Sequence, residues 1–138
     1  MKALKGILFW VASCTWGVIM TLIGAIVAIV LLVTGHKPHR FHYLIYFEVG
    51  SGWGGVELGA FFVVSRDASL HTKQHESGHG LQNIMLGVFM PFVICIPSAI
   101  RYWWRHFQIK KGRGATLPPY DSIWFEGWAT RLGEKYFN

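Results

Sequence analysis

Residues 75–79 read His-Glu-Ser-Gly-His, which is a HExxH motif. The motif lies within residues 67–90, whose pattern predicts a helix with Asp67 or Ser69 as its N-cap. Because residues four apart share one helix face, both imidazoles can reach one metal ion while Glu76 stands beside it. Two imidazoles and a carboxylate suit zinc and leave a fourth position for water, from which Glu76 can take a proton. The alternative is a histidine-rich helix at a membrane surface.

The C-terminal helix, predicted from Asp121 as N-cap towards Tyr136, offers a third metal ligand. One face of this helix carries a single carboxylate among small side chains: Glu126, Ala129, Thr130 and Gly133. Such a face lets the helix lie close to the HExxH helix, whose facing positions include Gly78. The alternative is a solvated glutamate on an amphipathic helix.

The composition is that of a membrane protein. Of the 138 residues 52% are hydrophobic and 14% charged, whereas soluble domains have about 25% charged residues. Disordered and low-complexity classes are excluded. The two cysteines, Cys14 and Cys95, lie in separate apolar runs and are interpreted as small hydrophobic residues, not disulfide partners. The net charge of +6 favours anionic lipid headgroups as partners over nucleic acid.

Residues 1–35 are interpreted as a transmembrane anchor. The 30 residues between Lys5 and His36 contain no Asp, Glu, Lys, Arg or His, and about 20 apolar residues are enough to cross a bilayer. Small side chains recur along this stretch at helical spacing. They favour two alternatives: a homodimer through the anchor helix, or packing against the protein's own second apolar segment.

That second segment, residues 80–100, is uncharged but interrupted by Pro91 and Pro97. Its 21 residues are too few for two crossings. Because proline bends the chain, we predict a re-entrant segment that enters and leaves the membrane by one face. The cations from Arg101 to Arg113 place that face in the cytoplasm. The expected location is a cell membrane, of the bacterial inner-membrane kind, with the site facing the cytoplasm and the N-terminus outside.

Residues 36–138 are expected to form one zincin-like unit. Two β-rich runs, Phe41–Val49 and Val56–Ser65, flank a glycine-rich link at 50–55, which predicts a β-hairpin. Gly59 predicts a bulge or a close backbone approach. The expected fold is therefore an α+β membrane protein. One N-terminal transmembrane helix precedes a hairpin, the HExxH helix, a proline-broken membrane-dipping segment and a C-terminal glutamate helix.

A HExxH motif followed by Glu-x-x-Ala, here Glu126 to Ala129, resembles the gluzincin metallopeptidases. The closest likeness is to the membrane-embedded ones, the CAAX prenyl protease type 1 and the heat-shock membrane endopeptidases. The string from His75 to Gln82 is also similar to small bacterial membrane proteins bearing HExGHxxQ. The resemblance covers residues 53–133. It implies four roles: Zn²⁺ ligands at His75, His79 and Glu126, and a catalytic base at Glu76.

One position departs from the family pattern. Thr130 stands where the family has an Asp that supports a ligand histidine; threonine can accept a hydrogen bond but brings no charge. The family also lays a peptide substrate along an edge strand beside the metal helix. The residues expected there are Gly55, Val56, Glu57 and Leu58. Weaker expectations concern His71, as support for a ligand or a headgroup contact, and three donors to a tetrahedral oxyanion: His106, Tyr120 and Arg131.

The expected function is a zinc-dependent, membrane-bound endopeptidase that hydrolyses peptide or protein substrates near the bilayer surface with a metal-activated water. One alternative is a non-catalytic zinc-binding membrane protein, a pseudo-peptidase that serves as a sensor or partner. Thr130 favours this alternative, whereas Glu76 favours the enzyme, because zinc binding alone does not need a base. A second alternative is a structural membrane protein in which the HExxH motif is a coincidence.

Overall fold

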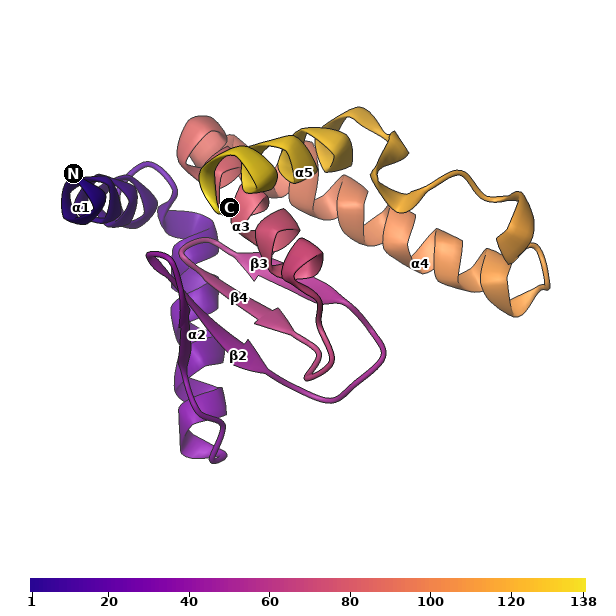
Figure 1. Ribbon diagram of the computed structural model, residues 1–138, viewed down its shortest axis with the longest axis horizontal. Helices are drawn as coiled ribbons and strands as arrows, with labels where there is room; N and C mark the ends of the chain where they lie inside the picture. Colours follow the sequence, from indigo (N-terminus) through magenta and orange to yellow (C-terminus); the bar gives the residue numbers. More distant parts are fainter.

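A computed structural model describes the whole chain, residues 1–138, and has α+β architecture, as predicted. Its main helices are α1 (Lys2–Cys14), α2 (Val18–Val33), α3 (Leu70–Leu86), α4 (Ile96–Lys110) and α5 (Trp124–Tyr136). Its strands are β1 (His39–Phe41), β2 (Leu44–Glu48), β3 (Gly55–Leu58) and β4 (Phe61–Val64). Figure 1 shows α3 and α5 side by side next to the sheet, with α4 extending away from it as an arm.

The four strands form one sheet in the order β1-β2-β4-β3, in which β3 is an edge strand. The central pair β2 and β4 is parallel, whereas β1 pairs with β2 and β3 with β4 in antiparallel fashion. The prediction that the two β-rich runs form one hairpin is therefore wrong. Instead the second run folds into a hairpin by itself, because Gly59 adopts a positive φ of 73° between β3 and β4. The link at 50–55 carries the chain from β2 to the edge strand.

Gly59 also makes the close backbone approach that was predicted for it. A Cβ at this position would lie 2.4 Å from the backbone nitrogen of Thr21 on α2. Further along α2, a Cβ at Gly24 would lie 2.2 Å from the carbonyl oxygen of Leu58. Helix α2 therefore packs on the sheet at backbone distance. The predicted boundary between an anchor, residues 1–35, and a separate unit, residues 36–138, stays a prediction.

The long apolar run at the N-terminus is broken. Helices α1 and α2 meet at an angle of 97°, so the prediction of one continuous helix is wrong. The corner is held from α3: Asn83 Nδ2 donates a hydrogen bond of 3.2 Å to the carbonyl of Gly17. Taken singly, each helix of the chain is too short or too polar to cross a membrane. Two helix pairs reach the required length and hydropathy only when joined across a sharp bend.

The second bent pair consists of α3, which is N-capped by Ser69 as predicted, and α4. The two segments meet at 116°, with a 3-10 turn at Gly87–Phe89 and a π-helical turn at Pro91–Cys95. The break at Pro91 is thus confirmed. Pro97 lies in the first turn of α4 and causes no bend there. Entry of this segment into a membrane stays a prediction.

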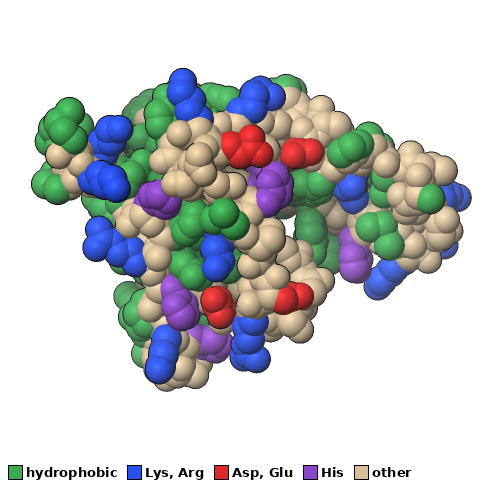
Figure 2. All heavy atoms as spheres, viewed as in Figure 1, with side chains coloured by type: hydrophobic (Ala, Val, Ile, Leu, Met, Phe, Trp, Pro, Cys, Tyr) green, Lys and Arg blue, Asp and Glu red, His purple; other side chains and the backbone are tan.

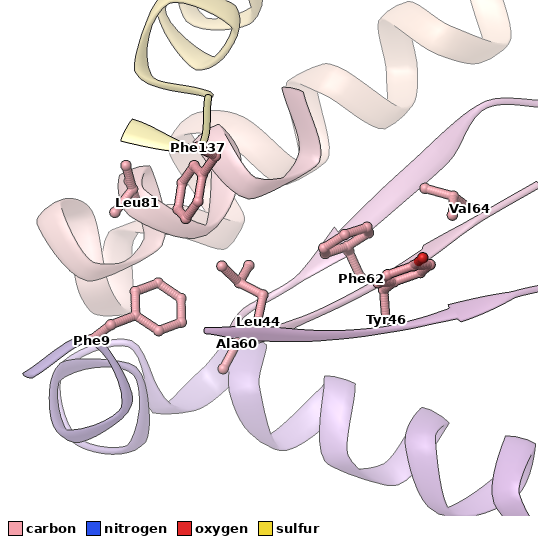
Figure 3. Packing of buried hydrophobic residues seen from close by; sticks show 8 residues of the cluster. All are labelled: Phe9, Leu44, Tyr46, Ala60, Phe62, Val64, Leu81 and Phe137. Carbon is pink, nitrogen blue, oxygen red and sulfur yellow. The ribbon is translucent and has the colours of Figure 1, made fainter. Parts of the chain in front are cut away.

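The main hydrophobic core lies between α3, the C-terminus and the sheet (Figure 3). Its buried side chains come from α1, β2, the turn between β3 and β4, β4, α3 and the chain end: Phe9, Leu44, Tyr46, Ala60, Phe62, Val64, Leu81 and Phe137. Helices α3 and α5 touch at backbone distance, because a Cβ at Gly78 would lie 1.9 Å from the carbonyl oxygen of Ala129. A Cβ at Gly133 would likewise lie 2.0 Å from the carbonyl oxygen of Gln74. The predicted close packing through small residues is confirmed, and it brings Glu126 over the HExxH motif.

Candidate metal centre

The centre of the site is a buried cluster formed by His75 and His79 of α3 and Glu126 of α5. Their ligand atoms all lie within 4.8 Å of one another. Glu126 Oε2 is 2.8 Å from His75 Nε2 and 3.0 Å from His79 Nε2. Tetrahedral zinc with bonds of about 2.0–2.1 Å separates its ligand atoms by about 3.3 Å. Each separation between Glu126 and a histidine is therefore within about half an ångström of the value for bound zinc. The predicted convergence of the three side chains is confirmed.

His75 is held from behind by a chain of two hydrogen bonds. Its Nδ1 lies 2.9 Å from Thr130 Oγ1, and that hydroxyl donates to Asp121 Oδ2 at 3.2 Å. A histidine that binds a metal through Nε2 carries its proton on Nδ1, so Nδ1 is the donor to Thr130. The carboxylate of Asp121 thus supports His75 through the Thr130 hydroxyl, whereas in the gluzincin pattern an aspartate at the position of Thr130 supports the histidine directly.

The role of Asp121 differs from the prediction. Helix α5 begins at Trp124, and its N-cap is Ile123, which makes no side-chain cap. Asp121 lies in the preceding 3-10 turn, Tyr120–Ser122, and turns its carboxylate towards Thr130. Sequence reasoning missed this role because Asp121 also fits the pattern of a helix N-cap.

His79 has its own support on the opposite side of the cluster. Its Nδ1 donates to Gln82 Oε1 at 2.6 Å, and Gln82 Nε2 donates to the carbonyl of Phe125 at 2.9 Å. Gln82 is completely buried. It therefore joins a ligand on α3 to the residue before the ligand on α5, which gives a physical role to the glutamine of the HExGHxxQ string.

Glu126 is also fixed by both of its oxygens. Its Oε2 faces the two histidines, and its Oε1 accepts a hydrogen bond from Ser98 Oγ on α4. Burial alone would raise the pKa of Glu126, but the hydrogen bonds from His75 and His79 hold it well below its usual value. Glu126 is thus a charged carboxylate, as a metal ligand would have to be. Sequence reasoning did not identify Ser98 as a partner of Glu126.

Glu76 is buried beside the cluster, but no hydrogen bond ties its carboxylate to another group. Burial raises the pKa of Glu76; His75 and His79 oppose this rise, and Glu126 adds a smaller contribution to it. The edge strand passes directly over it, since a Cβ at Gly55 would lie 2.9 Å from Glu76 Cγ. Glu76 is therefore a free carboxylate placed between the metal ligands and the edge strand.

Two cavities adjoin Glu76, one of about 480 Å³ and one of about 290 Å³. Figure 2 shows the surface hollowed between the body of the molecule and the arm formed by α4. Both cavities are lined by the same five residues: Trp53, Gly55, Glu76, Tyr102 and Tyr120. The larger cavity is also lined by the remaining residues proposed for substrate contact: Val56, Glu57 and Leu58. Burial raises the pKa of Glu57, which lies in that wall, well above its usual value.

The weaker candidates fall into two groups. Tyr120 lines both cavities, and burial raises its pKa to about 12, so its hydroxyl stays a proton donor at neutral pH. His71 lines the smaller cavity but is 57% exposed and lies 3.9 Å from Glu134. Arg131 and His106 are exposed and line neither cavity. Among the predicted donors, Tyr120 is the one that the fold brings to the site.

Comparison of the chain with protein-family models, with curated proteins and with solved structures finds no significant match. The class of protein is therefore defined by its fold and site. It is an α+β protein in which two helices at backbone distance bury a pair of histidines and a glutamate that can hold one metal ion.

Proposed function

We propose that this protein is a zinc-dependent endopeptidase acting on peptide or protein substrates near a bilayer surface. The observation that carries the proposal is the arrangement around Glu76. A buried His75, His79 and Glu126 cluster that suits zinc lies next to an unpaired carboxylate at the wall of an open cavity. A purely structural metal site has its ligands closed off and no need of such a carboxylate.

The residues divide the chemistry among them. Bound zinc would supply a Lewis acid and would lower the pKa of a water towards about 7. Glu76 is placed to accept the proton of the attacking water and to pass it to the leaving amine, and its raised pKa suits both transfers. Tyr120 can donate its hydroxyl proton to the oxyanion that develops on the carbonyl. The free edge of β3 can pair with an extended peptide.

The non-catalytic alternative loses its main support. It rested on Thr130, which lacks the charge of the family aspartate, but Asp121 supplies a carboxylate through the Thr130 hydroxyl. An oxyanion donor, Tyr120, also lines the cavity beside Glu76. Both features favour an enzyme over a zinc-binding sensor.

The proposed membrane contact is made by the exposed apolar faces of α1, α2 and α4. On α4 the side chains of Trp103, Trp104 and Phe107 are exposed and lie among cations, an arrangement that suits anionic headgroups on the cytoplasmic side. The exposed side chains of α1 and α2 include Leu8 and Ile26. These faces support an interfacial position, with the active site facing the cytoplasm.

The proposal is tested by zinc content and hydrolysis measured on the same preparations. Wild-type protein is expected to bind one zinc per chain and to hydrolyse denatured casein. Glu76→Gln should keep the zinc and lose hydrolysis, because only the base is removed, whereas His79→Ala should lose both. Glu134→Gln, at an exposed glutamate of α5, is the matched control and should behave as wild type. Full activity of Glu76→Gln, or zinc retained at full stoichiometry by His79→Ala, would refute the proposal.

A further inference from the structure

The two cavities beside Glu76 differ in chemistry. The larger one, about 480 Å³, lies on the His79 side and is lined mostly by hydrophobic side chains. The smaller one, about 290 Å³, lies on the His75 side and combines polar side chains with three aromatic ones. Since both include Gly55 and Glu76 in their walls, they form one groove that passes the reacting centre with an apolar half and a polar half.

The apolar half is built by side chains from three parts of the chain. Its lining combines α2, the edge strand and the segment around Pro91: Met20, Leu58, Met90, Ile94 and Cys95. Met90 and Ile94 are almost completely buried and belong to the second hydrophobic core, so this wall is fixed. A volume of about 480 Å³ lies within the range of about 300–1,000 Å³ that is typical of ligand sites. It accepts a bulky apolar group.

The polar half is built differently. Its own lining residues include His71, Thr72 and Asp121, which offer an imidazole, a hydroxyl and a carboxylate. These groups already contact Glu134, Ser69 and Thr130 respectively. A polar or cationic side chain could add a hydrogen bond to them, whereas a large apolar one would remove water from the Asp121 carboxylate without replacing it. The two halves therefore select opposite kinds of side chain.

The edge strand determines how a peptide would meet these two halves. Residues 53–55 line the smaller cavity and residues 55–58 line the larger one, so the two cavities follow each other along the edge strand. A peptide paired with β3 and centred on Glu76 would therefore run from one half of the groove into the other. We propose, building on the peptidase function above, that the substrate is a peptide with a bulky apolar residue on one side of the scissile bond and a polar residue on the other.

The experiment uses zinc-loaded protein and a set of internally quenched peptides that differ only at the residue facing the larger cavity. For the wild type, kcat/KM should be at least about 10-fold higher with Phe or Leu than with Ala, as expected for burial of several methylene groups. Ala99 of α4 also lines this cavity. Ala99→Phe should fill part of it and remove that preference while hydrolysis of the Ala peptide persists. Ile100→Phe, at the next residue of the same helix but pointing to the surface, is the matched control and should keep the preference.

The outcomes separate this inference from the proposed function. Hydrolysis without any preference for apolar residues, or a preference unchanged in Ala99→Phe, overturns the inference and leaves the peptidase intact. If no peptide is hydrolysed, the proposed function fails. Binding of fluorescently labelled peptides to the same protein, measured by fluorescence anisotropy, then tests whether the larger cavity prefers apolar residues. Tighter binding of the Phe peptide, lost in Ala99→Phe, supports the pocket, whereas equal binding overturns it. If Ala99→Phe fails to fold, Met20→Ala enlarges the cavity instead and should raise the preference for Trp over Leu; no change would contradict the assignment.

Discussion

Replacement of Thr130 by valine gives the sharpest test of the metal centre. Valine keeps the shape of threonine but removes the hydroxyl that accepts from His75 Nδ1 at 2.9 Å and donates to Asp121 Oδ2 at 3.2 Å. In Thr130→Val the Nδ1 proton of His75 has no acceptor, and the carboxylate behind it is disconnected. Loss of such support weakens metal binding by about 10–100-fold, which corresponds to about 1.4–2.8 kcal/mol.

The assay is competition for zinc against a chelator of known affinity, with folding of each variant checked by circular dichroism. Thr130→Ser restores the hydroxyl and should bind zinc within about threefold of wild type. Asp121→Asn keeps an acceptor without the charge and should fall between Thr130→Ser and Thr130→Val. Thr15→Val, at an exposed threonine whose hydroxyl bonds only within its own helix, is the control. Zinc binding by Thr130→Val as tight as that of wild type would refute the relay from His75 to Asp121.

Three further predictions follow from the same geometry. Gly78→Ala puts a methyl group 1.9 Å from a carbonyl oxygen of α5. It should lower the free energy of unfolding by about 1–3 kcal/mol, measured by urea denaturation, and should also lower zinc occupancy. Unchanged stability and zinc occupancy would contradict the contact between α3 and α5. In the metal-free protein burial opposes protonation of His79, but the hydrogen bond to Glu126 raises its pKa to about 9. Zinc must then displace a proton from His79. The apparent affinity for zinc should therefore rise about tenfold per pH unit from pH 7 to 9 and level off above pH 9. Competition with a chelator measures this affinity, and an affinity that does not change with pH would contradict the prediction. Replacing both Trp103 and Trp104 by serine should weaken binding to phosphatidylglycerol vesicles in a sedimentation assay, and undiminished binding would count against α4 as the lipid contact.

The part of the site that local spacing controls could be predicted from sequence. His75 and His79 are four residues apart on one helix, and the small-residue face of α5 specifies its own close packing, so the cluster with Glu126 follows from two helical patterns. The supporting side chains could not be predicted in this way. Ser98 and Asp121 reach the cluster from an arm and a turn, and no periodic pattern links a serine on one helix to a glutamate 28 residues later.

The errors in the predicted fold have a similar cause. The apolar run of residues 6–35 contains no proline or charge that would break a helix, and its corner is held by Asn83, which lies far along the chain. The hairpin was predicted around the glycine-rich link, but the turn forms at Gly59, where the backbone must fit against Thr21. In both cases a tertiary contact overrides a correct local propensity.

The bend before α4 is a requirement of the metal centre as well as a feature suited to a membrane. Ser98 follows His79 by 19 residues, and a straight helix would place them about 28 Å apart. Ser98 nevertheless donates to Glu126, the same carboxylate that contacts His79. The chain must therefore turn back between them, and the 116° bend at Pro91 is where it does so. Helix α4 thus carries Ser98 towards the site and Trp103 towards the surface, so contact of this arm with lipid would act on the same rigid element that positions the third ligand.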